Sequence, residues 1–292
     1  MEANIRELLL FYRMLGRPLT TLEIWRLLPN DSKPKNIAHL LQTLSVLQNQ
    51  NAVFEHDGFW SLENNPRVSM IRRRQDLLLD HKWKILKRLG KFYSLIPFID
   101  FVMVSGSMAF GNIHNQSDFD VLVGVKEGRM FTTRYLTILV FSLLGARRLD
   151  DLEESSPNKL CFNHFVTKKS LTKPPFNYYR SQLYRNLIPL WGTDASIKSF
   201  IEANLWAGTN DAILSDQRHL PHRNNIIKKI LEFKLNGRLG DIIENKIARA
   251  IAKRRLESYY EKHKQSGGRV VINDTELEFH FDLEYEKQLQ KL

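Results

Sequence analysis

The sequence predicts a mixed α+β protein with several domains, and three observations support this fold class. Residues 1–66 show three helical patterns followed by a β-hairpin pattern. Residues 98–172 alternate apolar strand patterns with a helical pattern, which predicts an α/β core with a mixed sheet. Residues 173–292 are polar with helical spacing, and they predict a mainly helical C-terminal domain. A chain of 292 residues with 43% apolar content is long enough for these parts and for sizeable cores.

The composition indicates a basic protein. The formal net charge is +11, so nucleic acid and nucleotide triphosphates are expected partners, unless the charge serves solubility alone. The one cysteine, Cys161, excludes an internal disulfide and a zinc site of several cysteines, which fits a cytoplasmic location. The N-terminus lacks a signal-peptide pattern, and the longest apolar span, Tyr135 to Leu144, is too short to cross a bilayer. We therefore expect no membrane as a partner.

Residues 1–66 hold the three helical patterns and the hairpin. Thr20 to Glu23 forms a capping box at the start of the second helix, and Asp57-Gly58 predicts a tight hairpin turn. The first and third helices each place apolar residues on one face: Ile5, Leu8, Leu9 and Tyr12, then Ile37, Leu40, Leu41 and Leu44. Three helices followed by a hairpin resemble a winged helix-turn-helix domain.

This resemblance implies nucleic-acid contacts through the third helix, which enters the major groove in such domains. The polar face of that helix offers Lys35, Asn36 and His39. A domain that makes protein contacts, and so a homodimer, is the open alternative. Residues 67–97 follow as a basic linker helix. Its Arg72, Arg73 and Arg74 either lie along a phosphate backbone or form a solvated helix face.

A short motif in the core combines a small-residue turn with two carboxylates. The apolar strand from Phe98 to Val104 ends at Gly106-Ser107, and Asp118-Phe119-Asp120 opens the next apolar strand. Side chains alternate along a strand, so both carboxylates point to the same side. Adjacent carboxylates repel each other unless a cation lies between them. This pair therefore suits Mg²⁺ or Mn²⁺ held together with substrate phosphates.

The Gly-Ser turn, the spacing and the Asp-x-Asp pair resemble the signature of the DNA polymerase β-like nucleotidyltransferase superfamily, in particular its minimal and antibiotic-modifying members. The resemblance covers residues 98–172. It implies metal-dependent transfer of an NMP group from an NTP to an acceptor hydroxyl of RNA, protein or a small molecule. It assigns catalysis and metal binding to Asp118 and Asp120, and nucleotide binding to Gly106, Ser107 and Ser117.

The superfamily carries a third carboxylate on the strand after the next helix, and this sequence has none there. That helix is expected over residues 129–144 and the strand over 159–167. We expect Asn163 at the carboxylate position as the third catalytic residue. His164 takes that position if the register differs by one residue. The acidic loop at 150–154 is a further source of the third group.

The missing carboxylate keeps other functions open, because an asparagine cannot take up a proton as a carboxylate can. The main alternative is a winged-helix nucleic-acid-binding regulator that uses a degenerate nucleotidyltransferase domain for nucleotide sensing or scaffolding. A toxin–antitoxin component is a third hypothesis, which no feature of the sequence selects.

Overall fold

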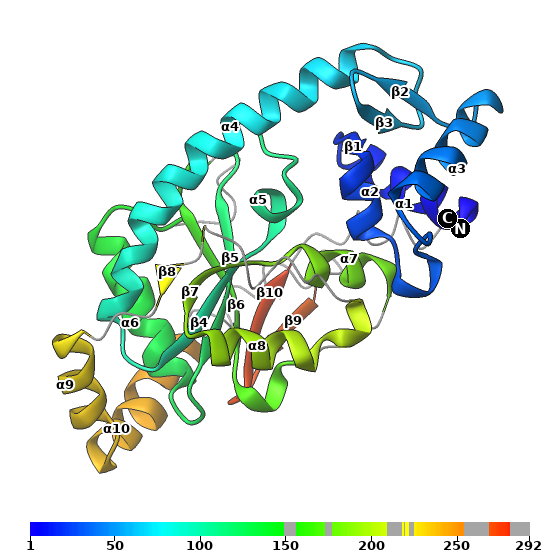
Figure 1. Ribbon diagram of the computed structural model, residues 1–292. Helices are drawn as coiled ribbons and strands as arrows, with labels where there is room; N and C mark the ends of the chain where they lie inside the picture. Colours follow the sequence, from blue (N-terminus) through cyan, green and yellow to red (C-terminus); the bar gives the residue numbers. More distant parts are fainter. Residues whose placement is uncertain are drawn as a thin grey trace.

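One large mixed sheet and one small antiparallel sheet organise the protein, with helices around both (Figure 1). The computed structural model describes residues 1–148, 156–172, 177–208, 218, 220–221, 225–253 and 269–280. Within these residues the expected mixed α+β class is confirmed. None of the described helices is long and apolar enough to span a membrane.

The small sheet belongs to the N-terminal domain, residues 1–66. Its strands are β1 (Leu19–Thr20), β2 (Phe54–His56) and β3 (Phe59–Ser61), in the order β1-β3-β2. Three helices surround it: α1 (Glu2–Met14), α2 (Thr21–Leu27) and α3 (Ile37–Asn49), with a 3₁₀ turn η1 (Asn30–Ser32). The Thr20–Glu23 capping box and the positive φ angles of Asp57 and Gly58 follow the sequence expectations.

A long helix, α4 (Arg67–Gly90), followed by η2 (Lys91–Leu95), runs from the small sheet along the large one (Figure 1). The helix was expected as a linker, but it also contributes to the core, because Trp83 and Leu86 are buried against the large sheet. Its Lys82 is buried as well. The helix therefore fixes the N-terminal domain to the core at both of its ends.

In the part of the chain that the structure describes, the large sheet contains seven strands in the order β8-β7-β4-β5-β6-β10-β9. Its centre follows the expected core: β4 (Ile99–Val104), α5 (Gly106–Phe110), β5 (Phe119–Val125), α6 (Met130–Leu143) and β6 (Leu160–Val166). β5 pairs with β4 antiparallel and with β6 parallel. Arg147 forms an isolated parallel bridge to Leu160.

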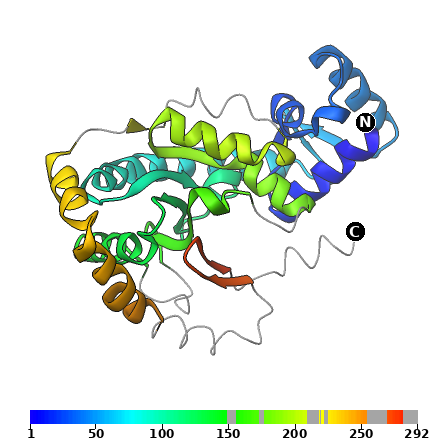
Figure 2. The ribbon, with the colours of Figure 1, turned by 90° about the horizontal axis from the view of Figure 1, so that it is seen from below.

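Helices cover both faces of this sheet. α4 and α6 bury one face, where Val102, Val121 and Val123 meet Phe141. The other face carries Phe101, Met103 and Leu122, and it is covered by α7 (Tyr178–Asn186) and α8 (Asp194–Ala203), with η3 (Lys168–Ser170) and η4 (Leu205–Ala207) nearby. Figure 2 shows α8 and α6 on opposite sides of the strands.

The C-terminal part differs from the expected separate helical domain, because four of its strands extend the same sheet: β7 (Ile188–Gly192), β8 (Leu220–Pro221), β9 (Arg269–Ile272) and β10 (Glu276–His280). Helix α7 ends at Asn186. Pro189 has no N–H for a helix interior, and Leu190 and Trp191 are buried in the core. The remaining described helices are α9 (Ile226–Leu235), α10 (Arg238–Ile242) and the π-helical η5 (Ile243–Ala248).

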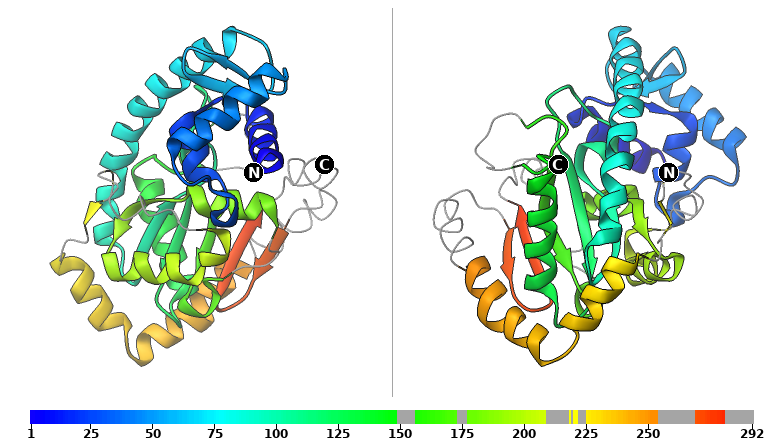
Figure 3. Two further views of the ribbon diagram at one scale, coloured as in Figure 1. Left: turned by 45° about the vertical axis from the view of Figure 1, so that its right-hand side comes forward. Right: turned by 90° about the vertical axis from the view of Figure 1, so that its left-hand side faces the viewer.

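The N-terminal domain is seated on the core beside α7 (Figure 3). Phe110 of α5 enters the apolar cluster of that domain, where its ring centroid lies 5.6 Å from that of Phe11. Arg17 Nη1 donates a hydrogen bond of 2.5 Å to the carbonyl oxygen of Gly111. Arg185 of α7 donates to the carbonyl oxygen of Leu27. These buried contacts join α5 directly to the N-terminal domain.

Candidate active site

Asp118 and Asp120 meet beside the central pair of strands. Asp118 directly precedes β5, and Asp120 is the second residue of that strand. One carboxylate oxygen of each lies within 4.8 Å of the other and of Sγ of Cys161, which pairs with Asp120 across β5 and β6. The two carboxylates are together as expected. The sequence did not indicate that Cys161 lies at this site, because its pattern does not distinguish Cys161 from a core residue.

The turn at Gly106 lies against the Asp120 carboxylate. Ser105 donates its N–H to the carbonyl oxygen of Asp120 at 2.9 Å, which holds the end of β4 beside β5. Gly106 has a φ of 58°, and a Cβ added there would lie 2.2 Å from Oδ2 of Asp120. A side chain therefore cannot fit at this position without moving the carboxylate. Ser107 follows in the first turn of α5 and is half-buried.

Asn163 lies beside the Asp120 carboxylate. Its Nδ2 donates a hydrogen bond of 3.2 Å to Oδ1 of Asp120. His164 instead lies 3.6 Å from Glu276 of β10, in a buried group that also includes Glu278. A bulge in β6 causes this arrangement, since Asp120 and Leu122 pair with Cys161 and His164, which are three residues apart rather than two.

Arg148 is a site residue that the sequence analysis missed. Its Nη1 donates to Oδ2 of Asp118 at 2.7 Å, and the two side chains are 23% and 16% exposed. The residue follows α6 in an irregular segment, and no local pattern marks it as a partner of Asp118. The acidic loop at 150–154, the other expected source of a third group, lies outside the described residues.

Lys82 of α4 positions the loop that leads into Asp118. Its Nζ donates to the carbonyl oxygens of Ser117 at 2.5 Å and of Asn115 at 3.1 Å. Burial lowers the pKa of Lys82, while the negative charge of Asp118 acts in the opposite direction. The buried Ser117 uses its hydroxyl within the loop, where it accepts the N–H of His114 at 3.0 Å. Ser117 is thus placed to support the loop rather than to face a nucleotide.

The donor set fits a hard divalent cation. Two carboxylates supply oxygen ligands, which Mg²⁺ and Mn²⁺ prefer, and Mg²⁺ sites in proteins typically use one or two carboxylates with phosphates and water. The thiol of Cys161 is a softer donor that suits neither ion. Among the described residues, the group at Asp118 and Asp120 contains no third carboxylate. Two protein ligands would leave the remaining coordination positions of such a cation to phosphate oxygens and water.

The expected nucleic-acid contacts need one correction, because Arg72 is buried. Its guanidinium binds both oxygens of Glu23, at 2.6 and 2.8 Å, and contacts Asp76 at 3.0 Å. These partners hold Arg72 inside the junction of α4 with the N-terminal domain. Arg73 and Arg74 remain exposed, and Arg73 lies 3.3 Å from Asp57.

The residues expected at the third helix lie at the start of α3. Lys35 is exposed, and His39 is half-buried. Asn36 caps the helix, and its Oδ1 accepts the N–H of His39 at 2.8 Å. The cap uses the side-chain oxygen of Asn36 and leaves its side-chain amide nitrogen at the surface.

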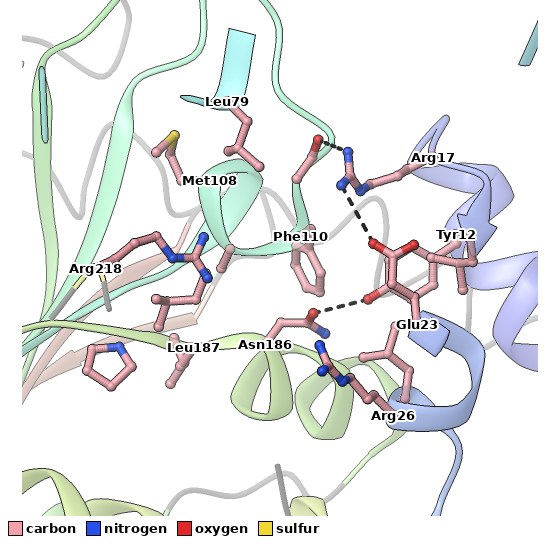
Figure 4. Close-up of a pocket in the computed structure, with 16 residues that line it drawn as sticks. Tyr12, Arg17, Glu23, Arg26, Leu79, Met108, Phe110, Asn186, Leu187 and Arg218 are labelled. Carbon is pink, nitrogen blue, oxygen red and sulfur yellow. Dashed lines mark hydrogen bonds and ion pairs between the residues drawn. The ribbon is translucent and has the colours of Figure 1, made fainter. Parts of the chain in front are cut away.

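A pocket of about 310 Å³ lies at the junction of the N-terminal domain with the core (Figure 4). Its walls include Arg26 of α2, Arg218, and the Phe110–Gly111 end of α5. Tyr12 donates to Oδ1 of Asn186 at 3.2 Å across it, and burial raises the pKa of this phenol. The pocket adjoins the end of α5 opposite to Gly106, so α5 lies between the pocket and the carboxylates.

Comparison of the chain with protein-family models, with curated proteins and with solved structures gave no match. The arguments for function therefore rest on the geometry of the site.

Proposed function

We propose that the protein is a metal-dependent nucleotidyltransferase, which moves an NMP group from an NTP to the hydroxyl of an acceptor. The observation that carries the proposal is the placement of Asp118 and Asp120 beside each other and against Gly106. Two neighbouring carboxylates offer a cation site, and the glycine lets the backbone of the turn approach the Asp120 carboxylate closely.

Each residue has a distinct role in this proposal. Asp118 and Asp120 would hold Mg²⁺ or Mn²⁺, which would offset negative charge on the triphosphate. The backbone of Gly106 and Ser107 faces the phosphates. The acceptor oxygen forms a bond to the α-phosphorus and its proton passes to water, while the bond between that phosphorus and the β-phosphate oxygen breaks and pyrophosphate leaves.

Because of Asn163, we expect nucleotidyl transfer to be slow. Its amide donates to Asp120 and does not accept a proton from the acceptor hydroxyl. Lys82 and Arg148 are the cations nearest to Asp118 among the contacts described above. They balance the carboxylate charge in the free protein. The arrangement supports strong binding of a metal–nucleotide complex and slow or specialised transfer.

Calorimetric titration with each NTP, with and without Mg²⁺, tests the proposal. Wild-type protein should bind NTP only with the divalent cation, and Asp118→Asn combined with Asp120→Asn should weaken that binding at least tenfold. Asp80→Asn, an exposed carboxylate on α4, is the matched control and should bind like the wild type. Equal NTP affinity with and without the cation contradicts the proposal. Labelled NTPs incubated with total RNA and protein then identify the acceptor.

A second candidate function is a nucleic-acid-binding regulator that senses the nucleotide. The contact of Phe110 with Phe11 favours it, because α5 runs from the Gly106 turn directly into the core of the N-terminal domain. A ligand that moves this turn by a small amount also moves Phe110. Packed apolar clusters transmit such a displacement rather than absorb it.

Duplex DNA binding, measured at several salt concentrations, tests the second candidate. The combined change Lys35→Ala and Arg74→Ala should lower the salt slope by about 2, since each lost phosphate contact removes about one unit. Asp118→Asn should leave duplex affinity unchanged but remove its response to NTP. If NTP does not change the duplex affinity of the wild type, nucleotidyl transfer is the better assignment of function.

A further inference from the structure

Helix α9 attaches to the core through polar side chains rather than apolar ones. Lys228 is buried, donates to the carbonyl oxygen of Ile99 at 2.9 Å and lies 4.5 Å from the centroid of Trp191. Glu232, one turn later, accepts the N–H of Phe98 at 2.8 Å. Lys228 and Glu232 also pair with each other at 3.8 Å. The inward face of α9 is therefore held by charged groups.

The outward face of the same helix is apolar. Ile226 is 73% exposed and Phe233 is 86% exposed, and Ile227 and Ile230 are also exposed between them. At 100° per residue these four side chains share one face, opposite to Lys228 and Glu232. A surface helix normally buries its apolar face and exposes its charges, so α9 has the reverse orientation. Large side chains exposed together in this way mark a contact surface.

Cations border this apolar face on both sides. Lys229 and Lys234 are exposed, and the helical spacing places one on each flank of the row from Ile226 to Phe233. Arg238, at the start of α10, is also exposed. The nearby acids each have a partner, since Glu232 accepts the N–H of Phe98, and Asp241, although exposed, lies 2.8 Å from Arg129. The surface is thus apolar in its middle and positive at its edges.

The charge pattern decides between the candidate occupants. A second copy in a two-fold contact would set identical surfaces against each other, so the lysines on the flanks of one α9 would approach those of the other. A bilayer that contains anionic lipid complements both the apolar middle and the positive edges of this surface. Its acyl chains contact the apolar face, and its headgroups contact the lysines, whose long side chains reach outward. Nucleic acid supplies the charge but no apolar layer.

The position of α9 suits such a contact. α9 and α10 lie at the end of the molecule farthest from the N-terminal domain (Figure 1). Glu232 and Lys228 hold the start of β4, at Phe98 and Ile99, whereas the Gly106 turn follows the other end of that strand. A surface that covers α9 therefore leaves the carboxylate site and the N-terminal domain open.

We propose that α9 is a docking helix for anionic lipid surfaces. The contact is peripheral, with Ile226, Ile230 and Phe233 inserted below the headgroups and with Lys229 and Lys234 at headgroup level. This inference is independent of the reaction at Asp118 and Asp120, and it departs from the expectation, drawn from the sequence, that no membrane is a partner.

Sedimentation of the full chain with vesicles tests the proposal. The probes are phosphatidylcholine vesicles and vesicles of phosphatidylcholine with phosphatidylglycerol at about 7:3. Wild type should sediment with the anionic vesicles and remain in solution with the neutral ones. Ile230→Ser combined with Phe233→Ser should lower the bound fraction at least tenfold. Leu143→Ser, at a side chain of α6 that is 80% exposed, is the matched control and should bind like the wild type.

Further variants separate a lipid contact from other causes. Lys229→Gln with Lys234→Gln should weaken anionic-vesicle binding about tenfold and make the remaining binding less sensitive to salt. Phe233→Trp should retain binding and shift its fluorescence to shorter wavelength on vesicles. The exposed side chains allow all variants to fold, which thermal unfolding checks. Absence of wild-type binding to anionic vesicles overturns the proposal, as does a concentration-dependent dimer that Phe233→Ser abolishes.

Discussion

The guanidinium of Arg148 binds Oδ2 of Asp118 at 2.7 Å, so one of the two proposed cation ligands already carries a positive partner. Both side chains are partly buried, at 23% and 16% exposure. The partner removes much of the repulsion between Asp118 and Asp120. It also competes for the oxygen that a divalent cation needs, since both charges favour the same carboxylate.

The first prediction concerns this competition. Arg148→Gln should tighten Mn²⁺ binding in the absence of nucleotide by about fivefold, which corresponds to an ion pair of about 1 kcal/mol. Calorimetric titration with Mn²⁺ measures the effect. Arg147→Gln, the neighbouring residue, is the control and should change the affinity little. A weaker Mn²⁺ affinity in Arg148→Gln would show that the guanidinium supports the cation site instead.

A second prediction uses two glycines with similar backbone conformation. Gly106 and Gly128 have φ angles of 58° and 72°, but a Cβ meets Asp120 only at Gly106 and nothing within 4 Å at Gly128. Alanine at either position should cost about 1 kcal/mol for the left-handed conformation. Gly106→Ala should cost more and should also abolish Mn²⁺ binding, because it displaces the Asp120 carboxylate. Urea unfolding and Mn²⁺ titration of both variants measure the difference. Equal behaviour of the two variants would contradict the close approach.

Much of the central fold could be predicted because it depends on local patterns. The apolar runs that form β4 and β5, and the helical pattern of α6, are continuous in the sequence and need no distant partner to be recognised. The Asp57-Gly58 turn depends on the φ angles that these two residues tolerate. The Asp118 and Asp120 pair follows from alternation along one strand.

The rest depends on partners far away in the chain. The run that forms β7 is short and apolar and follows α7 directly, so the sequence alone predicts a continued helix. Its pairing with β4 shows that it is a strand. Arg72 lies in a run of arginines, and Glu23, which buries it, is 49 residues away. The bulge in β6 leaves no signal in composition, yet it decides which side chains lie beside Asp120.

The third prediction concerns Asn163, whose amide donates to Asp120 at 3.2 Å. Asn163→Asp replaces this donor with a third carboxylate, so repulsion should destabilise the metal-free protein by about 1 kcal/mol. Mg²⁺ should restore the stability, because the added ligand tightens its binding. Thermal unfolding with and without Mg²⁺ measures both effects. Asn163→Ala is the control, since it removes the hydrogen bond without adding a charge. An identical Mg²⁺ response in both variants would place Asn163 outside the cation site.

The last prediction concerns Glu23, which holds the N-terminal domain to α4. Its carboxylate lies 2.6 Å from Arg72 and 3.8 Å from Arg17. Burial alone would raise the pKa of Glu23, but the hydrogen bonds and charge of Arg72, with those of Thr20 and Arg17, outweigh it and hold the pKa below its ordinary value. The folded protein thus binds fewer protons at this group than the unfolded chain does in acid.

Stability from Glu23 should therefore be complete above the ordinary pKa of a glutamate, about 4.3, and should be lost as the pH falls through the lowered folded value. Glu23→Gln should cost about 2 kcal/mol at pH 7, because the buried Arg72 keeps Asp76 but loses the charge of Glu23, which binds it through both carboxylate oxygens. That difference should shrink below about pH 4. Urea unfolding of both proteins from neutral to acidic pH measures it. Glu63→Gln, at an exposed pair with Arg13, is the control and should show almost no difference at any pH. If Glu23→Gln lowers the free energy of unfolding by the same amount at neutral and acidic pH, the shape of the side chain rather than its charge stabilises the junction of α4 with the N-terminal domain.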